Sequence, residues 1–250
     1  MTENGLELSV QSYCFRTYAS HAEVIEAVKA VGLSAVELCR AHLVLDGSQD
    51  AEPVVKQYAD AGVAISSYGV TKFTTDEAAA RRVFEFAKLA GFSAISTSVG
   101  RADADAVFAM LGKLGDEYDV NLAIHNHGRR DWLGPVWSLE DVFAKTSPRI
   151  GLCLDTAWML DAAGDPLAVA ARFADRLFGV HIKDFVFGRD GKPADVIVGT
   201  GNLDLPKLVA QLRTQAYGGH LTLEYEGDKD DPVPSTKACV AALQTACSAA

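Results

Sequence analysis

The segment Ile150-Gly151-Leu152-Cys153-Leu154-Asp155 is apolar on both faces until an aspartate ends it. A strand with no polar face is typical of a parallel sheet that helices cover. Seven other short apolar runs resemble this segment, and stretches with helical periodicity separate them. The eight predicted strands are Leu8–Tyr13, Ala35–Leu38, Val63–Ser67, Ala94–Thr97, Asn121–His125, Ile150–Leu154, Phe178–Ile182 and Leu221–Tyr225.

The spacing of these strands predicts the architecture. The centres of the first seven follow one another at intervals of roughly 26 to 30 residues, which is the length of one βα unit. Eight such units in 250 residues predict an α/β protein with one (β/α)8 TIM barrel domain over residues 1–250. A doubly wound open sheet is the structural alternative. The interval before the last strand is longer, and we expect its segment 185–204 to form a loop over the site.

Capping signals predict where several helices begin and end. Ser20 precedes one helical stretch and Gly32 follows it, while Asp204 precedes another stretch that has proline in its first turn. Ser138 and Asp141 have the spacing of an acidic capping box, which predicts that a helix begins after Ser138.

Composition excludes several classes of function. The chain has 33 acidic and 23 basic residues, a net charge of −10, which disfavours nucleic acid and anionic lipid as partners. No apolar run is long enough to cross a bilayer, and the N-terminus lacks the basic and apolar stretches of a secretory signal. The five cysteines are odd in number and none has CxxC spacing. We therefore expect free thiols and a cytoplasmic protein.

Polar residues close four successive predicted strands. His125, Asp155, His181 and Glu224 would converge at the C-terminal mouth of a barrel, where TIM barrels carry their chemistry. Two imidazoles and two carboxylates suit Mn²⁺, Zn²⁺, Fe²⁺ or Co²⁺ better than Ca²⁺. A single histidine at a strand end is more often structural, so the metal prediction depends on the coincidence of all four.

Further strand-end residues are open to two interpretations. His127 and Lys183 each follow a predicted ligand by two residues, which places them on the same side of a continuing strand. Lys183 with Asp184 could instead form a surface ion pair. Trp158 fits either core packing or a sugar platform, and Cys14 has no basic neighbour that would make it a nucleophile.

The motifs in the C-terminal half resemble the xylose-isomerase-like TIM barrels, the sugar phosphate isomerases/epimerases. The motifs are Leu122–Gly128, Gly151–Trp158, Ala163–Pro166, Arg176, Val180–Asp184, Val198–Gly201 and Leu223–Glu226, with weaker likeness at Gln11–Arg16 and Val36-Glu37. The resemblance implies a divalent metal, with Mn²⁺ expected first and Zn²⁺, Fe²⁺, Co²⁺ or Mg²⁺ as alternatives. Asp155, His181 and Glu224 match family ligands.

Two residues depart from the family pattern. His125 stands where many epimerases carry a glutamate of the proton-transfer pair, and this resembles the branch with inosose dehydratases and lyases of 3-keto-glycosides. Trp158 replaces a histidine that endonuclease IV uses for zinc, which argues against DNA repair.

The resemblance therefore predicts a metal-dependent isomerase or epimerase that acts through an enediolate on a sugar or keto-sugar. A lyase or dehydratase, and a non-catalytic binding barrel, are the alternatives. We expect His127 to be the acid/base, Lys183 to stabilise an enolate oxygen, and Glu37 to bind a hydroxyl or act as a second base. Arg16, His42 and Trp158 are expected in the pocket wall. The substrate is expected to lack phosphate, and a homo-oligomer or a small partner subunit stays open.

Overall fold

Eight parallel strands close into a barrel in the computed structural model, which describes residues 6–249. Strand β1 pairs with β2 on one side and with β10 on the other, so the sheet has no free edge. This closure confirms the predicted (β/α)8 barrel and excludes the open doubly wound sheet. The barrel strands are β1 (Glu7–Gln11), β2 (Ala35–Leu38), β3 (Ala64–Phe73), β4 (Ala94–Val99), β5 (Asn121–His125), β6 (Ile150–Asp155), β7 (Leu177–Ile182) and β10 (His220–Leu223).

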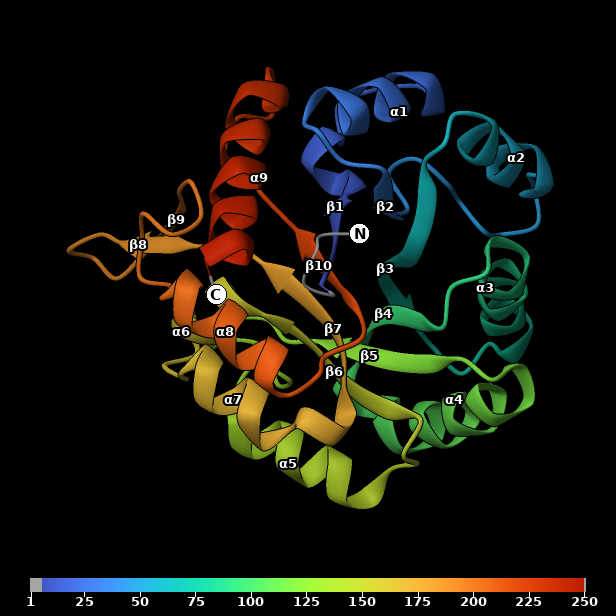
Figure 1. The fold of residues 1–250 in the computed structure, drawn as a ribbon. Coiled ribbons are helices and arrows are strands. Elements are labelled where there is room, and N and C mark those ends of the chain that lie inside the picture. Colours follow the sequence, from blue (N-terminus) through green and yellow to red (C-terminus); the bar gives the residue numbers. More distant parts are fainter. Residues whose placement is uncertain (1–5, 250) are drawn as a thin grey trace.

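Helices form a ring around the strands (Figure 1). Their apolar faces and the outward faces of the strands make the main core. The α-helices are α1 (His21–Ala30), α2 (Glu52–Asp60), α3 (Glu77–Ala90), α4 (Ala104–Tyr118), α5 (Val136–Lys145), α6 (Thr156–Asp161), α7 (Pro166–Arg172), α8 (Leu205–Thr214) and α9 (Pro232–Ala249). Short 3-10 helices span Ser12–Phe15, Arg101–Asp103 and Ala174–Arg176. None of the helices within residues 6–249 combines the length and apolar character that crossing a bilayer requires.

Two of the three capping predictions are confirmed. Ser20 and Glu23 form a reciprocal capping box at α1, and the Asp204 carboxylate accepts from the backbone N–H of Lys207 at α8. The prediction for Ser138 is wrong, because α5 already begins at Val136. Pro135 precedes that helix with a φ of −69°, a value that suits helix entry without any side-chain cap.

Strand β3 is longer than predicted. The prediction ended at Ser67, whereas the strand continues to Phe73 through Gly69. A side chain at position 69 would collide with the backbone of Ser96 on β4, since a Cβ there would lie 2.5 Å from the Ser96 carbonyl oxygen. Glycine therefore permits the close approach of β3 to β4 at a place where the sequence resembles a turn.

The segment 185–204 contains regular structure in place of the predicted loop. Strands β8 (Phe185–Phe187) and β9 (Pro193–Asp195) form an antiparallel hairpin that projects to the side of the barrel near α9 (Figure 1). The Asp184 carboxylate anchors the turn that follows, because it accepts hydrogen bonds of 2.8–3.0 Å from the backbone N–H groups of four residues. These four residues are Gly199, Gly201, Asn202 and Leu203.

Candidate metal centre

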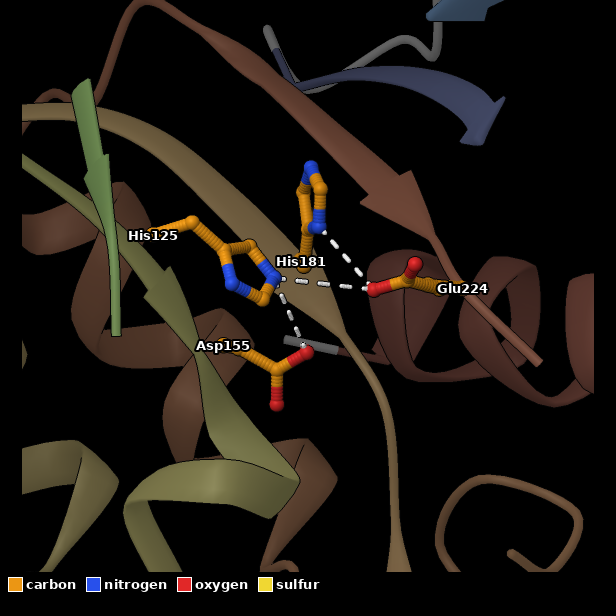
Figure 2. Close-up of side chains that lie close together, drawn as sticks. All are labelled: His125, Asp155, His181 and Glu224. Atoms are coloured by element: carbon orange, nitrogen blue, oxygen red, sulfur yellow. Dashed lines mark hydrogen bonds and ion pairs between the residues drawn. The ribbon is translucent and has the colours of Figure 1, made fainter. Parts of the chain in front are cut away.

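The four predicted ligands meet at the C-terminal mouth of the barrel. His125 ends β5, Asp155 ends β6, His181 lies on β7 and Glu224 directly follows β10. All four side chains are buried, and one nitrogen or oxygen atom from each lies within 4.8 Å of those of the others. Figure 2 shows the side chains pointing toward one another from their separate strands.

Distances within the cluster show how its nitrogen and oxygen atoms face each other. His125 Nε2 lies 3.4 Å from Asp155 Oδ2 and 3.7 Å from Glu224 Oε2. His181 Nδ1 lies 3.1 Å from the same Glu224 oxygen. The two imidazole rings have centroids 4.8 Å apart. Glu224 Oε2 therefore stands at the centre of the group.

Three buried polar atoms of this cluster lack a hydrogen-bond partner among residues 6–249. They are both ring nitrogens of His125 and Oδ2 of Asp155. A buried polar atom without a partner costs about 1–3 kcal/mol, so natural proteins seldom leave three together. Two nitrogens and two carboxylate oxygens match the donors that Zn²⁺, Mn²⁺, Fe²⁺ and Co²⁺ accept. The residues present therefore fit a transition metal.

Hydrogen bonds outside the cluster fix the orientation of Asp155. Its Oδ1 accepts from the backbone N–H of Trp158 at 2.7 Å and thereby caps α6. The Asn126 side chain forms two hydrogen bonds with the backbone of Asp155. It accepts from Asp155 N at 2.9 Å and donates to Asp155 O at 3.0 Å. One carboxylate oxygen is held by the helix, and the other is left facing His125.

In the metal-free protein, the carboxylates of the cluster favour protonation of the imidazoles, and the imidazoles favour ionisation of the carboxylates. Burial alone would lower the pKa of His125, but Asp155 and Glu224 outweigh burial and raise it to about 9. Burial likewise acts to raise the pKa of Glu224, but Lys183 and the two histidines hold it well below its usual range. A protonated imidazole thus supplies, in the metal-free protein, the positive charge that a bound ion would replace.

A cavity of about 360 Å³ opens beside the cluster. His125, His127, Trp158, Glu224 and Glu226 are among the residues that line it. This volume falls in the range of small-molecule sites. No residue of the segment 185–204 is part of its lining, although Phe185 of this segment packs edge-on against Trp158.

His127 lies where the two-residue spacing predicted. Its ring centroid is 4.7 Å from that of His125 and 6.3 Å from that of Trp158. Burial, and then the proximity of His125, lower the pKa of His127 below its ordinary value. The imidazole is therefore neutral near pH 7 and able to accept a proton.

Lys183 is buried, with an exposed fraction of 1%. Its ammonium group pairs with Glu226, lies 3.9 Å from Asp195 and sits over the rings of Trp158 and Phe185. Burial opposes its charge, yet the surrounding carboxylates raise the pKa of Lys183. The alternative of a surface ion pair with Asp184 is wrong, because Asp184 is also buried and binds backbone N–H groups.

Three predicted residues lie outside the lining of this cavity. Arg16 donates to the Glu226 carbonyl oxygen at 2.8 Å, and His42 Nε2 lies 3.1 Å from the Phe15 carbonyl oxygen. Glu37 lies behind His181, with its Oε2 3.1 Å from His181 Nε2. Trp158 is the expected wall residue that does line the cavity.

Sequence reasoning missed Gln11, Asn126 and Glu226 as parts of the site. Gln11 and Asn126 hydrogen-bond to other site residues, and Glu226 pairs with Lys183. Asn126 and Glu226 satisfy the strand-end rule that selected the four predicted ligands but were given no role, and Gln11, which ends β1, could have been found by the same rule.

Comparison with known proteins agrees with the barrel fold. Residues 25–246 match the family model described as xylose isomerase-like TIM barrel. The chain belongs to this family. The rhizopine catabolism protein MocC of Rhizobium meliloti is 29% identical to this chain over 141 residues. That match covers 49% of this chain and 42% of MocC.

Solved structures share the fold over nearly the whole chain. An L-ribulose 3-epimerase superposes with a TM-score of 0.76 and 17% identity, covering 98% of this chain and 95% of its own. The IOLI protein, crystallised with a zinc atom, gives a TM-score of 0.75 and 13% identity, covering 98% and 99%. At these identities the likeness establishes the fold.

Proposed function

We propose that this protein is a divalent-metal-dependent isomerase or epimerase that moves a proton beside the carbonyl group of a sugar or keto-sugar. The observation that carries the proposal is the buried cluster of His125, Asp155, His181 and Glu224, in which three polar atoms have no partner in the described chain. The cluster borders a cavity of about 360 Å³ at the catalytic face of a TIM barrel.

These four residues would hold the ion. A divalent ion bound there supplies Lewis acidity, which polarises a carbonyl group and makes the adjacent C–H acidic. The family resemblance favours Mn²⁺, and the zinc atom reported with the IOLI protein adds Zn²⁺ as a candidate. Both fit a set of two nitrogens and two oxygens.

His127 is the acid/base in this proposal. It lines the cavity, and its lowered pKa leaves it uncharged near pH 7. A ring nitrogen of His127 would accept the proton from the substrate carbon, and the resulting imidazolium would return it to a neighbouring position. The intermediate between these transfers is an enediolate, whose negative oxygen the Lys183 ammonium would stabilise at long range, since Lys183 is buried over the ring of Trp158 and does not itself line the cavity.

The cavity supports a carbohydrate as the substrate class. It is of monosaccharide scale, and it combines the polar groups of Gln11, Tyr13 and Glu226 with the flat ring of Trp158. The fold shared with an L-ribulose 3-epimerase agrees with this class.

Elimination by a lyase or dehydratase is the second candidate. His125 occupies the position where many epimerases carry a glutamate of the proton-transfer pair, so a mechanism with two glutamates is disfavoured. In elimination, His127 would take the proton, and the pair Lys183–Glu226, of which Glu226 lines the same cavity, would protonate a leaving group. A non-catalytic binding barrel would show neither reaction.

Incubation in D₂O with a panel of ketoses, keto-glycosides and inososes distinguishes these reactions. Deuterium incorporation without loss of water or aglycone supports isomerisation or epimerisation, and release of either supports elimination. We expect His127→Ala to lower the rate by roughly 10²-fold or more. His220→Ala, which changes a histidine at the start of β10 paired with Glu7, is the matched control. Equal rates in the two variants would remove His127 from the mechanism.

A further inference from the structure

His181 lies between two buried carboxylates. Its Nδ1 is 3.1 Å from Glu224 Oε2 within the cluster, and its Nε2 is 3.1 Å from Glu37 Oε2 on the opposite side of the ring. Because an imidazole can give only one nitrogen to a metal in such a site, the two carboxylates have different tasks. Nδ1 is the nitrogen that faces the other ligands.

Glu37 has no free oxygen. Its Oε2 faces His181, and its Oε1 accepts a hydrogen bond of 2.9 Å from Gln11 Nε2. The direction of the Gln11 amide is determined by its other partners, since its Oε1 accepts from Tyr13 N at 3.1 Å and its Nε2 also donates to Gly69 O at 3.1 Å. Gln11 must therefore donate to Glu37.

Glu37 also lies apart from the cavity that contains His127. It is 2% exposed and contacts a different cavity of about 700 Å³, whose lining includes Glu7 and His220 at the N-terminal end of the barrel. Both oxygens of Glu37 are hydrogen-bonded, and His181 separates Glu37 from the other predicted ligands. Glu37 is therefore poorly placed to exchange protons with a substrate at the C-terminal mouth.

We infer that Glu37 and Gln11 are positioning residues that hold His181 as an Nδ1 ligand, with its proton on Nε2. The inference rests on the proposed metal site and replaces the acid/base role expected for Glu37. Metal-bound histidines usually donate their second N–H to a carboxylate or carbonyl, which fixes the tautomer and the ring orientation. Here the Gln11 amide holds the carboxylate in turn, and the relay joins β1, β2 and β7.

Glu37→Gln is the sharpest variant, because it keeps the shape of the side chain. Glutamate accepts from both Gln11 and His181, whereas a glutamine can offer its oxygen to only one of them and must present NH₂ to the other donor. Gln11→Ala is the second variant, which leaves Glu37 in place without its support. Ser9→Ala is the matched control, since Ser9 is a buried polar residue of β1 whose hydroxyl, among residues 6–249, hydrogen-bonds to Thr222 Oγ1 at 2.7 Å.

The primary measurement is the Kd for Zn²⁺, determined by competition with a chromophoric chelator, together with the visible spectrum of the Co²⁺-loaded protein. We expect Glu37→Gln to weaken Zn²⁺ binding by 10–100-fold and to alter the Co²⁺ bands, with a smaller weakening in Gln11→Ala and none in Ser9→Ala. Unchanged Zn²⁺ affinity and an unchanged Co²⁺ spectrum in Glu37→Gln would overturn the inference. If activity falls while both stay unchanged, Glu37 acts on the substrate and not on His181.

Long-range ¹H–¹⁵N spectra of the zinc-loaded wild type test the tautomer directly. His181 is expected to carry its proton on Nε2 and bind through Nδ1, and a ring bound through Nε2 would overturn the inference. A wild-type protein that takes up no Zn²⁺, Mn²⁺ or Co²⁺ would instead refute the proposed function itself. If the protein binds metal but turns over no substrate, the Zn²⁺ affinity and the Co²⁺ spectrum still test the role of Glu37.

Discussion

The two oxygens of Asp155 have separate roles that substitution can distinguish. Oδ1 caps α6 through the backbone N–H of Trp158, while Oδ2 faces His125 Nε2 at 3.4 Å. Asp155→Asn keeps a capping oxygen, because Asn and Asp are equivalent caps. It also removes one of the two charges that keep His125 protonated, so that the neutral imidazole can accept through Nε2 from the new NH₂. Asp155→Ala removes both functions.

The metal-free variants should therefore differ in stability. Both variants lose the same buried charge, so in EDTA we expect Asp155→Ala to be less stable than Asp155→Asn by about 1 kcal/mol, the usual value of a helix cap. For a chain of this size, 1 kcal/mol corresponds to roughly 2–4 °C in Tm. Thermal unfolding followed by circular dichroism measures the difference.

Addition of metal should stabilise the wild type and leave both Asp155 variants almost unchanged. At a free Zn²⁺ concentration 100 times the Kd, binding stabilises the wild type by about 2.7 kcal/mol, or roughly 5–11 °C. Both Asp155 variants should show little or none of this rise. Asp165→Asn, which changes the carboxylate that caps α7, is the matched control and should keep it. A full metal-induced rise in Asp155→Asn would refute the assignment of Oδ2 as a ligand.

The remaining predictions concern the buried charges around Lys183. Burial raises the pKa of Asp195 from 3.8 to about 6, so the folded protein binds more protons than the unfolded chain between about pH 4 and 6, and stability should fall as the pH rises through this window. Asp195→Asn should flatten that fall, and an unchanged slope in urea titrations at several pH values would contradict the assignment. Lys183→Met removes the buried ammonium that offsets the charge of the buried Glu224 and should cost about 3–5 kcal/mol of unfolding free energy. Lys207→Met, in an exposed pair, should cost less than about 1 kcal/mol, and similar losses in the two variants would contradict the burial argument.

Much of the fold could be predicted because one βα unit has a narrow range of lengths. Buried strands such as Ile150–Asp155 carry no polar face, and polar residues at their C-terminal ends must gather at one mouth when the barrel closes. The same logic predicted that His127 and the four proposed ligands lie together. It depends on periodicity and strand position alone.

Other features depend on contacts between distant residues, which periodicity does not contain. The hydrogen bonds that join Gln11, Glu37 and His181 connect three strands, and only the closed barrel brings them together. Arg16 and His42 follow strands but lie in loops, whose backbone path turns them away from the cavity. The hairpin within 185–204 is short and has little apolar alternation, so its sequence resembles a loop.

The location of a bound metal ion would show whether the four buried side chains form one metal site. A crystal of the chain grown with Mn²⁺ or Zn²⁺ can be measured on both sides of the metal absorption edge. We predict one strong anomalous peak between His125, Asp155, His181 and Glu224. A peak elsewhere in the molecule, or none at this cluster under saturating metal, would contradict this prediction.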